Sequence, residues 1–269
     1  MIDWKKYVDR IFIVHYAGHK EREAALFGEM KRVGIWNSGI MQIHENIQSP
    51  FLERLMTCIQ YDKDHLNKGS FSASFGHYFV MKISEMKEYD RIMIFENDVC
   101  FLKNIDTISQ VLDNIPNDCD VGLLTHFQTP CTEPCKIKKY FSEMEKSRSE
   151  NTIFIPYGGD SAELGSAGCY VLSKTAVTSL CGLYEHSMEL PDIIFREQAY
   201  DRRYTKNKFH RQVLERLKKY YSRIPICIQR VYQNSITMDL QKPLLWKKIE
   251  ETGIRINETV GIFRKNYNI

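Results

Sequence analysis

The order of apolar and polar residues along the chain predicts buried strands that alternate with amphipathic helices. Short apolar runs are typical of strands buried in a sheet, whereas apolar residues three and four apart mark one face of a helix. Strands are predicted at 10–14, 41–44, 92–95, 120–124, 152–156 and 168–173. Helices are predicted at 21–33, from 68 to the strand at 92, at 109–115, and from Lys174 onward with Ser173 as N-cap. This alternation predicts an α/β fold with a mostly parallel sheet covered by helices.

The chain changes character after residue 200. Nine Lys and Arg residues lie within 202–223, and only Asp201 and Glu215 oppose them. Apolar residues between Val213 and Tyr221 predict a helix with one apolar face. Two interpretations stand: a solvated helix packed on the core, or a contact with an anionic surface such as membrane headgroups or an acidic glycolipid.

Composition narrows the class of protein. The chain has 269 residues, of which 43% are hydrophobic and 12% aromatic, and this predicts a well-packed globular core. The net charge of +3 argues against a dedicated nucleic-acid binder. The first residues contain no apolar targeting region and no apolar run reaches membrane-spanning length, so we expect a cytoplasmic protein. Several of the eight cysteines lie in apolar runs, which predicts reduced buried thiols.

The candidate chemistry lies in the segment 91–101, where an apolar strand ends in Glu96, Asn97 and Asp98. Residues two apart on a strand share a face, so Glu96 and Asp98 could point the same way at the carboxyl end of the strand. Ligands of open α/β sheets bind at this end. Two neighbouring acids need a cation or a proton to compensate them. The pattern therefore favours a divalent metal that carries substrate phosphates, and solvated loop acids are the alternative.

Read together with this turn, several other segments resemble glycosyltransferase family 25. This is the family of lipooligosaccharide-type galactosyl- and glucosyltransferases, which also includes collagen galactosyltransferases. The matching segments follow the family's order between about residues 10 and 240: Ile11 to Arg22, the glycine-rich helix start that ends in His77, Glu96-Asn97-Asp98, Gly165 to Ser173, Pro191-Asp192 and Gln233 to Ser235. The chain departs from the family pattern at His15, Gly76 and Asn97, where the family has asparagine, serine and an acid.

The resemblance implies a GT-A-like (Rossmann-like) fold and inverting transfer of galactose or glucose from a nucleotide sugar, expected to be a UDP-hexose. The expected acceptor is a surface glycan or glycolipid, and the expected cofactor is Mn²⁺ or Mg²⁺. The resemblance further implies a catalytic core at 1–199, which the basic helical segment and C-terminal strand and loop at 200–269 complete as one domain. Contact with the inner face of a membrane through 202–223 is one of the two interpretations given above for that segment, and a nucleic-acid partner is not expected.

The resemblance also implies roles for particular residues. We expect Asp98 to bind the metal directly, and Glu96 to contact the nucleotide ribose or a metal-bound water. Residues expected on the donor side are Arg22, His77, Gln233 and Ser235. Each of these has a structural alternative: a surface ion pair for Arg22, a hydrogen-bonded core histidine for His77, and turn formation for the two loop residues.

Inverting transfer also needs a general base that deprotonates the acceptor hydroxyl. The candidates are Asp160 and Glu163 in a glycine-rich loop, and Asp192 after Pro191. Family order favours Asp192, for which the alternative is a helix N-cap. A second hypothesis is a catalytically silent module that binds a nucleotide sugar or a glycan on the same scaffold, and Asn97 in place of an acid supports it.

Overall fold

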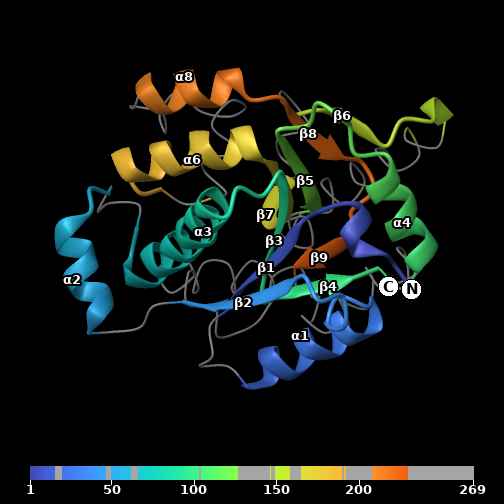
Figure 1. The fold of residues 1–269 in the computed structure, drawn as a ribbon, viewed down its shortest axis with the longest axis horizontal. Helices are drawn as coiled ribbons and strands as arrows, with labels where there is room; N and C mark the ends of the chain where they lie inside the picture. Colours follow the sequence, from blue (N-terminus) through green and yellow to red (C-terminus); the bar gives the residue numbers. More distant parts are fainter. Residues whose placement is uncertain are drawn as a thin grey trace, which may run out of the picture.

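The computed structural model describes residues 1–15, 20–46, 50–61, 66–102, 104–126, 146, 149–157, 165–189, 191 and 208–229. Within these ranges a mixed sheet forms the centre of the molecule and helices lie against it (Figure 1). The strands are β1 (Arg10–His15), β2 (Met41–Glu45), β3 (Arg91–Glu96), β4 (Val99–Phe101), β5 (Val121–His126), β6 (Phe154–Pro156), β7 (Gly165–Ser173), β8 (Lys219–Ser222) and β9 (Cys227–Gln229). The helices are η1 (Trp4–Lys6, a 3-10 turn), α1 (Lys20–Arg32), α2 (Phe51–Cys58), α3 (Lys68–Met86), α4 (Ile105–Asp113), α6 (Lys174–His186) and α8 (Lys208–Arg216).

The main path of the sheet runs in the order β2-β1-β3-β7-β5-β8-β6. Five of these seven strands (β1, β2, β3, β5 and β8) share one direction, while β7 and β6 run the opposite way. Beside this path, β4 pairs with β9, and β9 also pairs with β5. The predicted α/β class, with a mostly parallel sheet and a helical cover, is confirmed.

Side-chain caps define where several helices begin. The hydroxyl of Ser173 accepts a hydrogen bond from the backbone N–H of Ala176 at 3.1 Å, which confirms the predicted start of α6. Asn67 caps α3 in the same way. The helix predicted at 109–115 begins earlier, at Ile105, because the side chain of Asn104 accepts from the N–H groups of the first turn.

The basic segment after residue 200 is only partly helical. Helix α8 covers Lys208–Arg216, but the residues from Lys219 to Ser222 form β8, so the helical face predicted as far as Tyr221 is wrong at this end. Tyr221 is fully buried in a strand that pairs with β5 and β6, and this pairing overrides the helical spacing. Lys219 and Arg223 are buried as well, and Lys218 forms an ion pair with Asp118 at 3.0 Å. Lys219 and Arg223 are therefore part of the fold, whereas the Lys218–Asp118 pair lies at the surface.

The described cysteines are free thiols, and all of them except Cys58 are buried. Burial raises the pKa of the Cys119 and Cys181 thiols to about 12, so both are protonated at neutral pH. The prediction of reduced, buried thiols in apolar runs is confirmed for Cys100, Cys169 and Cys227. Cys131 and Cys135 lie outside the described residues.

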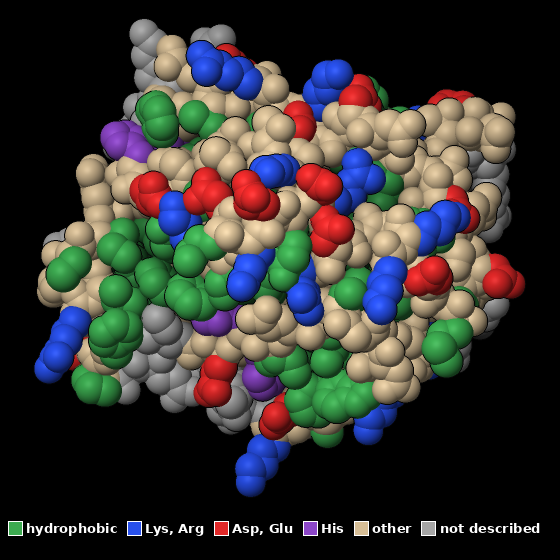
Figure 2. All heavy atoms as spheres, in the orientation of Figure 1, with side chains coloured by type: hydrophobic (Ala, Val, Ile, Leu, Met, Phe, Trp, Pro, Cys, Tyr) green, Lys and Arg blue, Asp and Glu red, His purple; other side chains and the backbone are tan. Residues whose placement is uncertain are grey.

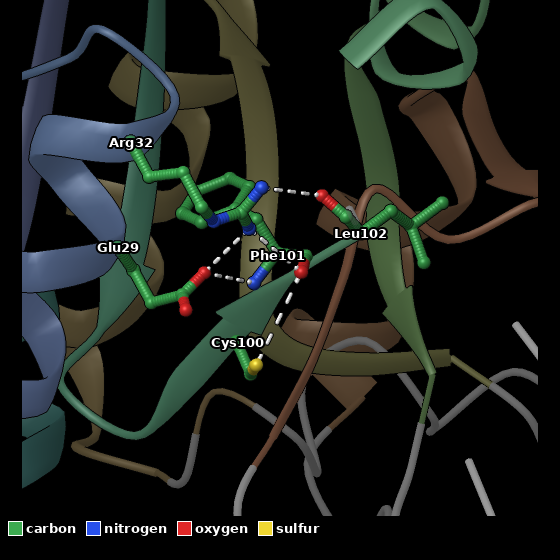
Figure 3. A network of polar contacts seen from close by, with 5 residues as sticks. All are labelled: Glu29, Arg32, Cys100, Phe101 and Leu102. Carbon is green, nitrogen blue, oxygen red and sulfur yellow. Dashed lines mark hydrogen bonds and ion pairs between the residues drawn. The ribbon is translucent and has the colours of Figure 1, made fainter. Parts of the chain in front are cut away.

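A polar network fastens α1 to β4 (Figure 3). The guanidinium of Arg32 donates to the carbonyl oxygens of Phe101 and Leu102 at 2.9 and 3.0 Å. The carboxylate of Glu29 accepts from the backbone N–H of Phe101 at 3.1 Å and pairs with Arg32 at 2.6 Å. Because charge-assisted hydrogen bonds are stronger than neutral ones, this network fixes the position of α1 against the strand that follows the Glu96–Asp98 turn.

Charges of both signs are interspersed on the surface shown in Figure 2. Hydrophobic side chains gather on this face over α2 and α3. Phe51 of α2 and Phe79 and Met86 of α3 are exposed. Within the part of the chain that the structure describes, no helix has both the length and the apolar character needed to cross a membrane.

Candidate functional site

Polar side chains collect at the carboxyl ends of three neighbouring strands, β1, β2 and β3. These strands are parallel, and their register pairs His15 with Glu45 and Val14 with Glu96. Their ends therefore meet at one edge of the sheet. In β1 and β3 the residues before the end are apolar and buried, so the change to polar residues marks the point where the chain leaves the core. This is the edge at which open α/β sheets bind ligands.

The Glu96–Asp98 segment is a turn held at both ends. Strand β3 ends at Glu96, Asn97 and Asp98 form the turn, and β4 begins at Val99. Asp98 therefore lies outside the strand, and strand alternation does not set its direction relative to Glu96. Glu96 and Asp98 are half-buried and Asn97 is buried. The pairing of β3 on one side and the α1–β4 network on the other fix where these side chains lie.

His77 supports Glu96 from the interior. Its side chain is fully buried in α3, with Nε2 3.2 Å from Oε1 of Glu96 and Nδ1 2.6 Å from the hydroxyl of Tyr170. A carboxylate only accepts hydrogen bonds, so Nε2 carries a proton, and in the neutral ring the tyrosine hydroxyl donates to Nδ1. The Tyr170–His77–Glu96 chain thus links α3, β7 and the end of β3, and His77 acts on Glu96 from a position that solvent does not reach.

His15, the last residue of β1, contacts the same turn. The amide nitrogen of Asn97 lies 3.3 Å from Nδ1 of His15. On the other side of the ring, Nε2 lies 4.0 Å from Oε1 of Glu23, which belongs to α1. Burial lowers the pKa of His15, and the charges of Glu23 and Glu45 only partly oppose this effect, so the imidazole is neutral at neutral pH.

Helix α3 approaches the strand ends unusually closely at Gly76. A Cβ atom at this position would lie 2.1 Å from Oδ1 of Asn46 and 2.8 Å from Cγ1 of Val14. Asn46 is itself held by a hydrogen bond of 2.7 Å from its backbone N–H to the carbonyl oxygen of His15. The absence of a side chain at Gly76 therefore allows the next residue, His77, to reach Glu96.

The carboxylates of the turn suit a divalent cation that is shared with a ligand. Among the described residues, no group of three or more His, Cys, Asp and Glu side chains could hold a metal ion. Mg²⁺ and similar ions, however, are commonly bound by one or two carboxylates, with phosphate and water oxygens as the remaining ligands. Asp98 lies two residues after Glu96, so this segment contains two carboxylates of the kind that such a cation needs.

The structure brings some of the predicted site residues together. Glu96, Asp98 and His77 lie in or against the same turn, and Arg22 is buried in α1. The other predicted site residues, Asp160, Glu163, Asp192, Gln233 and Ser235, lie outside the described residues.

Four residues of this region were not predicted as site residues: His15, Glu23, Asn46 and Tyr170. His15 could have been predicted from the sequence, because it is the polar residue that ends an apolar strand. The contact of Tyr170 with His77 joins residues 93 positions apart, and no pattern in the sequence predicts it.

Comparison with known proteins gives weak similarities of the whole fold. No protein-family model matches the chain, and no curated protein sequence matches it either. Three solved structures described as glycosyltransferases are similar, each with a TM-score of 0.36. Mouse xyloside xylosyltransferase 1 is 11% identical, over 79% of this chain and 96% of its own. The galactosyltransferase LgtC is 10% identical, and the match covers 90% of this chain and 95% of LgtC. GlyE of Streptococcus pneumoniae is 10% identical, and the match covers 96% of this chain and 63% of GlyE. Similarities at this level assign neither residues nor a reaction to this chain.

Proposed function

We propose that this protein is an inverting hexosyltransferase of glycosyltransferase family 25, which moves galactose or glucose from a UDP-hexose to a glycan or glycolipid acceptor. One observation carries the proposal: the Glu96–Asp98 turn lies at the carboxyl edge of three parallel strands, and buried side chains hold it there. A rigid acidic turn at a ligand-binding edge suits a substrate that arrives with phosphate-bound cations. The order of family-like segments along the chain supplies the reaction class.

In this proposal Asp98 would hold the divalent cation, Mn²⁺ or Mg²⁺, that accompanies the diphosphate of the donor. When bound, the cation neutralises the charge that develops on the departing nucleoside diphosphate. Glu96 contacts the donor ribose or a cation-bound water. Its hydrogen bond from His77 restricts the carboxylate to one orientation, so less conformational freedom is lost when the donor binds.

The remaining roles follow the family-like segments. Arg22 lies on the donor side, as do the loop residues Gln233 and Ser235. The general base that removes the proton of the acceptor hydroxyl is Asp192, with Asp160 and Glu163 as the other candidates.

The acceptor side is proposed on the same basis. A glycolipid acceptor would bring the protein to the inner face of a membrane, with contact through 202–223 and the segment 200–269 completing the catalytic domain. Part of that segment enters the central sheet as β8, and Lys219 and Arg223 are buried within the fold. The membrane contact would therefore depend on the remaining basic residues of the segment.

The proposal is tested by incubating the purified chain with UDP-galactose, UDP-glucose and other nucleotide sugars, with Mn²⁺, with Mg²⁺ and with a chelator. The expected result is release of the nucleoside diphosphate from a hexose donor only when the cation is present. Thermal unfolding in the same mixtures reports donor binding, because a ligand that binds the folded state raises the unfolding midpoint. Saturable donor binding without release, in the presence of a panel of glycan acceptors, would instead support the catalytically silent binding module.

A further inference from the structure

His15 presents a hydrogen-bond donor that the described part of the protein does not use. Its side chain is only 5% exposed. The amide nitrogen of Asn97 faces Nδ1 at 3.3 Å, and an amide NH₂ group only donates, so Nδ1 accepts and the proton of the neutral ring lies on Nε2. Within the described ranges Nε2 has no hydrogen-bond partner. Buried polar groups are normally satisfied, so this N–H points to an acceptor atom on a ligand.

A hydrogen-bond acceptor stands beside that donor. Oε1 of Glu23 lies 4.0 Å from Nε2 of His15, too far for a hydrogen bond between them but close enough for one ligand to contact both. The side chain of Glu23 is 37% exposed, so its carboxylate can be reached from solvent, whereas Nε2 of His15 is buried beside it. Glu23 lies on α1, which Glu29 and Arg32 fasten to β4. The backbone that carries the acceptor is therefore held in place relative to the strand end that carries the donor.

We infer that His15 and Glu23 recognise the lactam edge of a nucleobase, the adjacent C=O and ring N–H that uracil and guanine share. The inference rests on the proposed function, in which a nucleotide sugar binds at this edge of the sheet. Nε2–H of His15 donates to the carbonyl oxygen, and the carboxylate of Glu23 accepts from the ring N–H. Cytosine and adenine present the reverse order, an amino donor beside a ring-nitrogen acceptor. With these bases the amino group would face the donor of His15, and the ring nitrogen would face the acceptor of Glu23. Neither pair can form a hydrogen bond, and a site that leaves buried polar groups unpaired rejects such a ligand strongly.

Asn97 determines which nitrogen of His15 carries the proton, and so whether Nε2 donates or accepts. An aspartate at position 97 would accept a hydrogen bond from the ring and draw the proton to Nδ1 of His15. Nε2 would then become an acceptor, and the preference for a lactam edge would be lost. The selectivity for the base therefore depends on a residue that need not touch the base.

Binding of free nucleoside diphosphates to the full chain tests the inference. The probes are UDP, GDP, CDP and ADP with Mg²⁺, measured by calorimetry. We expect UDP or GDP to bind at least tenfold more tightly than CDP and ADP, and the comparison of UDP with GDP identifies which lactam base is preferred. Glu23→Gln should reduce the tenfold ratio to less than threefold, because an amide donates as well as accepts. Asn97→Asp should reduce it too.

Glu45→Gln is the matched control, since Glu45 is the other carboxylate whose charge acts on His15 but is not part of the pair. It should leave the ratio unchanged. Thermal unfolding of each variant confirms that the chain is folded. Equal affinity for all four nucleotides, or a ratio that Glu23→Gln and Asn97→Asp leave intact, would overturn the inference while the proposed function stands. Failure to bind any nucleoside diphosphate would overturn both.

Discussion

Nε2 of His77 lies 3.2 Å from Oε1 of Glu96, and through this contact helix α3 holds the carboxylate that ends β3. The other nitrogen of the same ring accepts from Tyr170 on β7, so the orientation of Glu96 depends on three separate elements. A carboxylate held in this way is preorganised for a ligand, as effective sites on rigid elements require.

Tyr170→Phe tests this positioning chain. The change leaves Nδ1 of His77 buried without its donor, so we expect a loss of about 1–2 kcal/mol in the free energy of unfolding. We also expect kcat/KM for the sugar donor to fall roughly tenfold, because Glu96 is no longer held in one orientation.

A double-mutant comparison separates positioning from simple destabilisation. In a Glu96→Gln background, Tyr170→Phe should still lower stability but should cause little further loss in kcat/KM, since its effect on the donor acts through Glu96. Additive losses of kcat/KM in the double variant would contradict this role.

Gly76→Ala tests the close approach of α3 to the strand ends. The added Cβ would meet Oδ1 of Asn46 and Cγ1 of Val14, so we expect a loss of about 1–3 kcal/mol in the free energy of unfolding, measured by urea denaturation. Adding Asn46→Ala should recover part of this loss because it removes the nearer obstacle.

Gly28→Ala is the matched control for that experiment. Gly28 lies within helix α1, and a Cβ there would meet nothing within 4 Å. Because alanine has the higher helix propensity, this variant should be unchanged or more stable by roughly 0.5–1 kcal/mol. Equal losses at Gly76 and Gly28 would show that the contact with Asn46 does not matter.

His210 on α8 makes stability depend on pH. Burial lowers the pKa of His210 to about 4, and the nearby charge of His186 contributes in the same direction. The unfolded chain, whose histidines titrate near 6.5, therefore binds a proton that the folded chain resists. Stability should fall as the pH drops from about 6.5 to about 4, by roughly 2–4 kcal/mol from this residue.

Urea denaturation across this pH range tests the expectation. His210→Leu removes the titrating group and should flatten the decline, whereas His186→Gln removes only the smaller contribution and should retain most of it. If the wild-type chain and His210→Leu show the same pH dependence, α8 does not enclose a neutral histidine.

Local patterns were sufficient to predict much of the fold. The strands β1 and β3 are continuous apolar runs, and α6 has its N-cap serine in sequence, so each could be found from a few neighbouring residues. The strand β8 could not, because its tyrosines follow a helical spacing and become a strand only by pairing with β5. Helix α2, which lies at 51–58, was not predicted either.

The same division holds for the candidate site. Glu96 and Asp98 were found because acids directly after a buried strand are unusual. The contact of Asn97 with His15 joins residues 82 positions apart, and the contact of Tyr170 with His77 also depends on tertiary packing. Gly76 was noted only as a departure from a family pattern, and its reason, the side chain of Asn46, becomes visible in the folded chain.

Replacement of Asp98 tests the central claim most directly. Asp98→Asn keeps the size of the side chain but removes its charge, and Asp106→Asn, at an exposed acid in the first turn of α4, is the control. Release of nucleoside diphosphate from a UDP-hexose in the presence of Mn²⁺ is measured for both variants and for the wild-type chain, with thermal unfolding as the check on folding. The account predicts that Asp98→Asn loses at least 100-fold in turnover, about 2.7 kcal/mol of transition-state stabilisation, while Asp106→Asn retains full turnover. A folded Asp98→Asn protein with wild-type turnover would contradict it.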